Sequence, residues 1–370
     1  MSKEDDIFKS IETMNEDAST LSEGSLSMVS EWIDTGSYAL NAIVSGGLYK
    51  GVPKGRIIGF AGPSGCGKSY IMNKIAAKFQ KESPDHWVEI WDTEAAVEKD
   101  SFTNVGGNPD RVKVFPVETV ESCRNQIVKF LNNVIDAGEK HVGKHLIIID
   151  SIGNLASQKE VDDTEKDKHA ADMGLRAKTL KSMMRTLTYR AAKAGVTILF
   201  SNHTYDDPTA MYEKIVKNQS GGKGPVYLAS LLVQLSVTQE KGDKNDGETL
   251  ALARKINSVN MRALTVKNRF IPAFLETELH LNFVSGLDKY GGLLNMLTSY
   301  GIIIQGGATY TLRSDLAEKY GKEKLGYYKV WSKDDDIWDL ILPELDKELR
   351  SALSYNNESI IADEDEYEEE

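Results

Sequence analysis

The sequence predicts an α/β fold with a mostly parallel, twisted sheet, helices on both of its faces and antiparallel strands at its end. Short apolar runs such as residues 146–149 alternate with helical stretches, which is typical of a parallel sheet buried on both sides. A glycine-rich loop at residues 62–69 separates one such run from a helix, the usual setting of a phosphate-binding loop. The 370 residues suffice for one large core and a smaller lobe.

Composition and charge narrow the classes of protein. Two cysteines suggest no disulfide framework and favour a reducing compartment. The acidic N-terminus does not resemble a signal peptide, and no apolar run approaches a membrane span, so we expect a cytoplasmic protein without a membrane partner. The formal charge is −12, and seven of the last eight residues are acidic, which predicts a disordered tail over residues 359–370.

The N-terminal 30 residues are expected to form an oligomerisation arm and a linker. Ile7, Ile11 and Met14 have the spacing of one helical face. So short a helix cannot bury that face alone, which favours packing on a neighbouring subunit. The Ser/Glu/Gly mixture at residues 18–27 is typical of a linker.

The core is expected to span residues 31–285 and a small C-terminal domain residues 286–358. Apolar runs predict strands at 56–61, 87–92, 112–117, 146–149 and 196–200, with helices at 69–79 and 120–135. Less separated runs at 231–237, 250–256, 263–267 and 275–283 predict antiparallel strands. After Gly286 we expect a helix, a turn at Gly306-Gly307 and further helices to about residue 354.

The segment GPSGCGKS at residues 62–69 fits the P-loop pattern G-x-x-x-x-G-K-[ST]. Its backbone N–H groups and the helix dipole would attract phosphates. Lys68 is expected to reach the outer phosphates and the Ser69 hydroxyl to bind Mg²⁺. The predicted nucleotide contacts are Gly62, Pro63, Ser64, Gly65, Cys66, Gly67, Lys68, Ser69 and Tyr70.

Polar residues at three other strand ends complete this prediction. Asp150 ends an apolar strand and fits a magnesium-binding carboxylate. Glu94 is a candidate to orient or deprotonate water, with Asp92 as its competitor. His203 would face the same crevice as a phosphate sensor, although a lone histidine is more often structural. Cys66 precedes a helix N-terminus and Lys68, which predicts a lowered thiol pKa and inhibition by alkylation.

A basic stretch suggests nucleic-acid binding. Two long polar segments, residues 157–169 and 204–223, flank a predicted amphipathic helix within residues 166–193, whose net charge is +6. The predicted DNA contacts are Lys178, Lys181 and Arg185 on one helical face, Arg176 nearer the apolar side, and Lys217 and Lys223. Lys267 and Arg269 form a cationic pair that fits either an ordinary surface or a contact with a neighbour's phosphates.

These motifs together resemble the RecA-type recombinases, most closely the UvsX branch of tailed bacteriophages. The resemblance covers about residues 35–297. It rests on residues 62–69, Trp91-Asp92-Thr93-Glu94, residues 150–157, residues 201–205, residues 221–229, Lys267-Asn268-Arg269 and residues 286–294.

The resemblance implies an ATP- and Mg²⁺-dependent helical filament on single-stranded DNA that pairs with homologous duplex DNA and exchanges strands. It also implies single-strand-binding and mediator proteins as partners, in the cytoplasm of a bacterial host if the chain is phage-encoded. Glu94 matches the catalytic glutamate, Asp150 the magnesium acid, and His203 the switch to the second DNA loop. Lys178 and Arg185 match DNA-phosphate contacts, while Lys267 and Arg269 match the pair that touches ATP across the subunit interface.

The sequence departs from this family at the adenine site. Ser101 stands where relatives have a stacking tyrosine, so either the adjacent Phe102 takes that role or adenine is held less tightly. The first DNA loop is also unusually charged. Two alternatives stay open: a hexameric helicase-type motor, distinguished by unwinding and rings, and a regulatory ATPase that binds proteins, distinguished by the absence of DNA stimulation.

Overall fold

The computed structural model describes residues 24–166, 174–205, 216–239 and 258–354, together with Met14, residues 17–20 and Ser22. The strand expected at residues 250–256 and the acidic tail lie outside the described residues. Of the N-terminal helix expected from Ile7, Ile11 and Met14, only Met14 is described.

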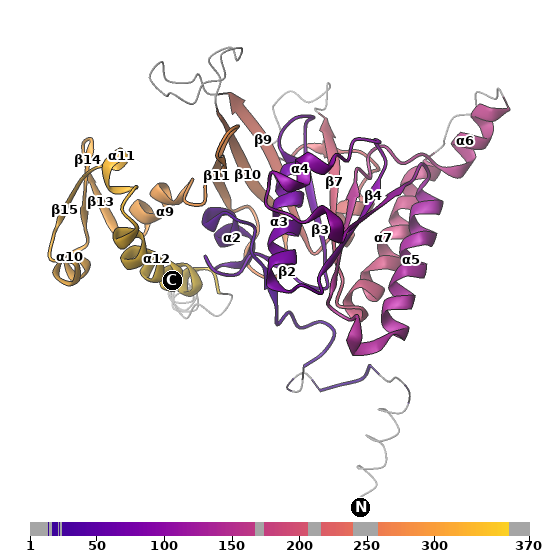
Figure 1. Cartoon of the computed structure of the whole chain (residues 1–370), viewed down its shortest axis with the longest axis horizontal. Helices are drawn as coiled ribbons and strands as arrows, with labels where there is room; N and C mark the ends of the chain where they lie inside the picture. The colour runs from indigo at the N-terminus through magenta and orange to yellow at the C-terminus, as the bar shows by residue number, and fades with distance from the viewer. Residues whose placement is uncertain are drawn as a thin grey trace, which may run out of the picture.

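A ten-stranded sheet forms the centre of the molecule (Figure 1). The strand order is β12-β11-β10-β9-β3-β7-β6-β4-β5, and β8 pairs with β7. The strands from β9 to β5 in this order run parallel, and β9 to β12 run antiparallel. This confirms the predicted α/β class with antiparallel strands at its end. Its strands are β3 (Ile57–Gly62), β4 (Trp87–Asp92), β5 (Val112–Pro116), β6 (His145–Asp150), β7 (Thr197–Tyr205), β8 (Asn218–Gln219), β9 (Leu231–Gln239), β10 (Ser258–Asn268), β11 (Glu276–Asn282) and β12 (Gly286–Leu287).

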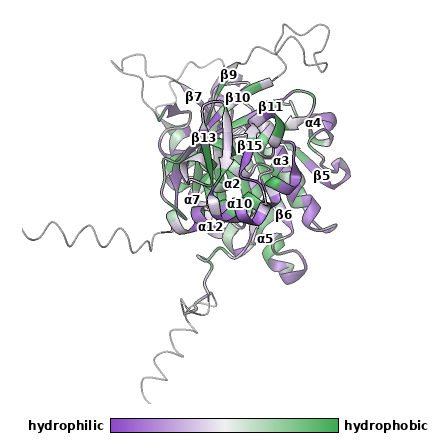
Figure 2. Ribbon diagram, turned by 90° about the vertical axis from the view of Figure 1, so that its left-hand side faces the viewer, coloured by the Kyte–Doolittle hydropathy of each residue, from purple (hydrophilic) through white to green (hydrophobic). Residues whose placement is uncertain are grey.

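Helices cover both faces of this sheet because successive strand residues point to opposite sides. In β3, Ile58 and Phe60 pack into one core cluster with α3, whereas Ile57 and Ala61 pack into a second cluster with α5 and α7. Figure 2 shows the hydrophobic residues gathered in the centre of the molecule. The helices around the sheet are α2 (Tyr38–Ser45), α3 (Lys68–Glu82), α4 (Lys99–Thr103), α5 (Val120–Asp136), α6 (Gln158–Glu165), α7 (Leu175–Lys193) and α8 (Gly224–Leu228).

Two segments expected to be irregular are partly regular. The residues after Phe200 continue β7 to Tyr205, because Thr204 pairs with Gln219 of β8. The expected first DNA loop contains the helix α6, which starts at a capping box: the Ser157 hydroxyl accepts from the Glu160 N–H, and the Glu160 carboxylate accepts from the Ser157 N–H.

The chain after β12 forms a lobe, at the left of Figure 1, whose hydrophobic core also includes Ala39, Ala42 and Leu48. Its helices are α9 (Leu293–Ser299), α10 (Ser314–Tyr320), α11 (Tyr328–Trp331) and α12 (Asp335–Ala352), and its strands are β13 (Ile303–Gly306), β14 (Thr309–Leu312) and β15 (Lys324–Tyr327). The turn at Gly306-Gly307 joins β13 and β14. The sequence pattern predicted only helices and a turn here, and the three-stranded sheet β13-β14-β15 was not predicted.

Contacts across the chain attach this lobe to the core. The Asp346 carboxylate of α12 accepts a 2.6 Å hydrogen bond from the backbone N–H of Leu48, which follows α2. Leu48 and Ala39 are buried in the same cluster as Trp338. Before α2 and after it, β1 (Trp32–Ile33) and β2 (Val52–Pro53) form a separate two-stranded ribbon.

Candidate nucleotide site and nucleic-acid surface

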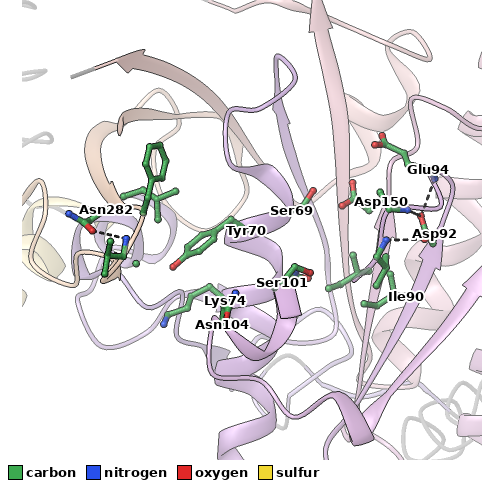
Figure 3. Close-up of a pocket in the computed structure, with 18 of the residues that line it drawn as sticks. Ser69, Tyr70, Lys74, Ile90, Asp92, Glu94, Ser101, Asn104, Asp150 and Asn282 are labelled. Atoms are coloured by element: carbon green, nitrogen blue, oxygen red, sulfur yellow. Dashed lines mark hydrogen bonds between the residues drawn. The ribbon is translucent and has the colours of Figure 1, made fainter. Parts of the chain in front are cut away.

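The predicted site residues converge at the carboxyl ends of the parallel strands. The register pairs Gly62 of β3 with His203 of β7, and Asp92 of β4 with Asp150 of β6. A ligand crevice at this edge is the general rule for open α/β sheets. Figure 3 shows Ser69, Glu94 and Asp150 side by side in this crevice.

The loop between β3 and α3 has the geometry of an anion-binding site. Gly65 and Gly67 adopt left-handed φ angles of 75° and 85°, which disfavour any residue with a side chain. The Lys68 ammonium is folded back onto the loop, where it donates to the carbonyls of Gly62 at 3.0 Å and Pro63 at 2.7 Å. The first turn of α3 therefore presents its N–H groups to the crevice, and Lys68 is held at its edge.

The expectation for Cys66 is wrong in its direction. Burial raises the pKa of this thiol above its ordinary value and outweighs the opposing effect of Lys68. The side chain is 1% exposed and its Sγ lies 3.9 Å from the Lys68 ammonium. Cys66 is thus a packing residue beneath the loop rather than a reactive thiolate.

The structure separates the roles of Asp92, the last residue of β4, and Glu94, which follows it. Asp92 is buried, and its carboxylate accepts from the backbone N–H groups of Glu94 at 3.0 Å and Val97 at 3.3 Å. It therefore holds the turn in shape. The Glu94 carboxylate is left to face the crevice, which favours Glu94 over Asp92 as the candidate base.

Three side chains surround the Glu94 carboxylate. Its Oε1 accepts from the Asn154 amide at 2.9 Å and the Ser151 hydroxyl at 3.1 Å, and lies 3.5 Å from His203 Nε2. Sequence reasoning assigned no role to Asn154 and no contact to Ser151. A signal was available, because both lie within four residues of Asp150, where a buried strand ends.

His203 connects this acid to the second polar segment. Its backbone carbonyl accepts from the Ser220 N–H at 3.1 Å, and the neighbouring Asn202 amide donates to the Ser220 carbonyl at 2.9 Å. Gly153 lies against the ring: a Cβ there would be 2.9 Å from His203 Cδ2. The imidazole therefore lies against Glu94 and Gly153, while the backbone of His203 is bonded to Ser220.

Asp150 and Ser69 both line the crevice and suit a hard cation. The Ser201 hydroxyl donates to Asp150 Oδ1 and fixes its orientation. No group of three or more His, Cys, Asp or Glu side chains placed to hold a metal occurs among the described residues. One carboxylate and one hydroxyl suit Mg²⁺, which takes few protein oxygens and completes its shell with water and phosphate.

A cavity of about 650 Å³ extends from Ser69 along α3, a volume typical of ligand sites. It is lined by Tyr70 and Lys74 of α3, by Ser101 and Asn104 near α4, and by the turn at residues 281–286. The Phe102 ring is 3% exposed and packs in the hydrophobic core, so it does not face this cavity. The structure thus contradicts the expectation that Phe102 stacks on a base.

The predicted DNA contacts fall into two groups. Lys178, Lys181 and Arg185 are exposed along α7, and none of the three makes an ion pair or side-chain hydrogen bond with the described residues. Arg176 behaves differently: its guanidinium donates to the carbonyls of Ile152, Gly153 and Leu155. Arg176 therefore braces the loop behind Glu94, which contradicts its assignment as a free DNA contact. Lys223 is exposed, and Lys217 is partly buried.

Lys267 and Arg269 lie at the opposite edge of the sheet from the phosphate loop. Arg269 N–H donates to the Ser230 carbonyl, and Ser230 N–H to the carbonyl of Ile57, where β3 begins. The loop lies at the other end of β3, and five residue steps of about 3.3 Å place those ends roughly 17 Å apart. This pair does not reach the loop of its own chain.

The environment of this pair is electropositive. Burial, and then repulsion from Arg269, lowers the pKa of Lys267 to about 8. The Lys267 ammonium donates to the carbonyls of Val226 at 3.2 Å and Tyr227. Arg269 lines a second cavity of about 600 Å³ with Arg56. An anion from outside the chain would relieve this repulsion.

Comparisons with known proteins agree with this geometry. Residues 5–288 match the family described as the RecA N-terminal domain. The chain is 31% identical over 297 residues to the recombination and repair protein of Enterobacteria phage T4, covering 80% of this chain and 70% of that protein. It is 26% identical to Protein RecA of a Wolbachia strain, covering 90% and 84%, and 27% identical to Protein RecA of Nitratiruptor, covering 92% and 90%. The helices in the described part of the chain are too short or too polar to span a bilayer.

Proposed function

Because the chain belongs to the RecA family, we propose that it is an ATP-dependent recombinase that assembles as a helical filament on single-stranded DNA and exchanges strands with a homologous duplex. The observation that carries the proposal is the cluster of Glu94, Asn154, Ser151 and His203 beside the phosphate loop. It joins a candidate catalytic acid to a segment that leads toward the basic helix α7.

In this proposal the residues of the crevice bind ATP with Mg²⁺. Lys68 would give up its hydrogen bonds to the loop carbonyls and donate to the outer phosphates instead. Ser69 and Asp150 would hold the cation, which would neutralise charge on the phosphates. Glu94 orients and deprotonates the attacking water, with Asn154 and Ser151 fixing its carboxylate. We propose that this site hydrolyses ATP.

The site is proposed to be composite. Lys267 and Arg269 lie too far from their own loop to stabilise its phosphates, and they suit the nucleotide of a neighbouring subunit. Loss of the γ-phosphate would then loosen both the subunit interface and, through His203 and Ser220, the grip on DNA. The N-terminal arm and the small C-terminal domain are proposed to serve assembly and partner contacts.

The proposed DNA surface is the exposed face of α7. Lys178, Lys181 and Arg185 lie on that face with spare donors, and phosphate contacts of this kind make affinity depend on salt. We expect each Lys→Ala or Arg→Ala change to reduce, by about one, the slope of the logarithm of the DNA-binding constant against the logarithm of the salt concentration. Single-strand-binding and mediator proteins are the proposed partners, in the cytoplasm of a host cell.

Strand exchange between homologous substrates with ATP tests this function. The wild-type chain should exchange strands, and Lys68→Ala should not. Failure of the wild type with partner proteins supplied would refute the recombinase proposal. Duplex unwinding by rings would instead indicate a helicase-type motor, and ATPase activity indifferent to single-stranded DNA would indicate a regulatory ATPase; the family match favours neither.

A further inference from the structure

The far end of the nucleotide cavity raises the question of how a base is recognised. Beyond Ser69 the cavity continues past Tyr70 and Lys74 to the turn around Asn282, and both α3 side chains extend toward that turn (Figure 3). On the α4 side it is lined by Ser101 and Asn104. The Phe102 ring is buried in the hydrophobic core. On this side a base would therefore meet the polar side chains of Ser101 and Asn104 and no aromatic ring.

Lys74 is a partly buried cation in this part of the cavity. Its stem packs over Gly36, where a Cβ would lie 3.0 Å from Lys74 Cε, and its ammonium makes one long bond of 3.4 Å to the carbonyl of Val105. It has no ion pair with any residue that the structure describes. Lys78, one helical turn later, differs because it pairs with Asp34 at 2.6 Å.

The electrostatic environment of Lys74 favours a ligand that accepts hydrogen bonds. Burial lowers the pKa of Lys74, and repulsion from Lys78 and Lys81 lowers it further, against a smaller attraction from Asp34. An ammonium carries only donors, and two of its three N–H groups are unassigned here. An acceptor placed in the cavity would therefore be bound, whereas another donor would be repelled.

This inference rests on the proposed function: we propose that Lys74 reads the base of the bound nucleotide and widens the accepted substrates from adenine to 6-oxopurine nucleotides. The N7 and O6 atoms of guanine are both acceptors and match a lysine, whereas adenine presents N7 beside the N6 amino donor. Asn104, whose carbonyl neighbour Val105 contacts Lys74, has a donor and an acceptor and suits either purine.

The test measures nucleotide binding by the full-length chain without DNA, with AMP-PNP and GMP-PNP as the two ligands and Mg²⁺ present. The wild type should bind GMP-PNP within about tenfold of AMP-PNP, and Lys74→Met should weaken GMP-PNP about tenfold more than AMP-PNP. Lys129→Met is the control, since it removes an exposed charge of α5 that does not line the cavity, and it should leave both affinities unchanged.

A second measurement needs no variant. The nucleotide 7-deaza-GTP lacks the N7 acceptor and should displace AMP-PNP from the wild type about tenfold less well than GTP. Equal losses of both ligands in Lys74→Met, negligible GMP-PNP binding by the wild type, or equal displacement by GTP and 7-deaza-GTP would each overturn the assignment of Lys74. Absence of AMP-PNP binding would instead refute the proposed function itself.

Discussion

Asn154→Ala isolates the positioning of the proposed catalytic acid. The change removes the 2.9 Å hydrogen bond from the Asn154 amide to Glu94 Oε1 and leaves Ser151 and His203 in place. A hydrogen bond to a charged group is worth about 1.5–3 kcal/mol. The Glu94 side chain is 37% exposed, and solvent screening reduces this to about 1 kcal/mol.

One kcal/mol corresponds to a loss of about fivefold in kcat. DNA-stimulated ATP hydrolysis at saturating ATP measures this effect, and titration with AMP-PNP should show unchanged binding because Asn154 does not line the nucleotide cavity. Asn133→Ala, which alters an exposed asparagine of α5, is the control. A kcat within twofold of the wild type, or a parallel loss of AMP-PNP affinity, would refute the positioning role.

Three further predictions concern pH, thiol chemistry and stability. In the isolated chain the pKa of Lys267 is about 8, and a neighbour's phosphate would favour the protonated amine, so assembly takes up a proton above pH 8. Filaments monitored by light scattering should therefore weaken as the pH rises from 8 to 10. The same pH dependence of assembly in Lys267→Arg would contradict this. Because burial raises the pKa of Cys66, iodoacetamide at pH 8 should leave this thiol unmodified in the folded protein and alkylate it in urea, as mass spectrometry will show; equal labelling rates would count against its burial. Asp346→Ala leaves the Leu48 N–H without its acceptor and should lower the free energy of unfolding by about 1–3 kcal/mol in urea titrations. Asp339→Ala, at an exposed position of the same helix, should leave it unchanged. Equal free energies of unfolding for Asp346→Ala and the wild type would show that the bond to Leu48 does not stabilise the lobe.

The phosphate loop and its neighbours were predictable because their geometry follows from local rules. A P-loop pattern between a strand and a helix fixes the anion site, and parallel strands bring their carboxyl ends to one edge. Asp150 and Glu94 then had to lie near Ser69. The strands expected at 56–61, 87–92, 112–117 and 146–149 differ from β3, β4, β5 and β6 by at most one residue at each end.

The orientation of Phe102 was not predictable because α4 has only five residues. In so short a helix, nothing in the sequence pattern decides whether Ser101 or Phe102 faces the cavity. The choice depends on a distant backbone position: Phe102 lies against Gly107, where a Cβ would be 2.2 Å from its ring. Such a contact becomes visible only in three dimensions.

Two other failures have related causes. The strands β13, β14 and β15 have four residues each, too few to show an alternating pattern. The role of Arg176 depends on carbonyl groups about 20 residues earlier in the chain, which α7 approaches only after folding. Its position on the apolar side of the helix hinted at a different contact without identifying it.

The two ends of β3 have a consequence for how activity scales with assembly. The phosphate loop lies at one end and Lys267 and Arg269 near the other, so in the proposed filament each nucleotide is shared by two copies. An open row of n copies then holds n − 1 complete sites, and one terminal copy always has an unmatched loop. Specific ATPase activity should therefore rise with filament length, and isolated chains should be nearly inactive even when saturated with ATP.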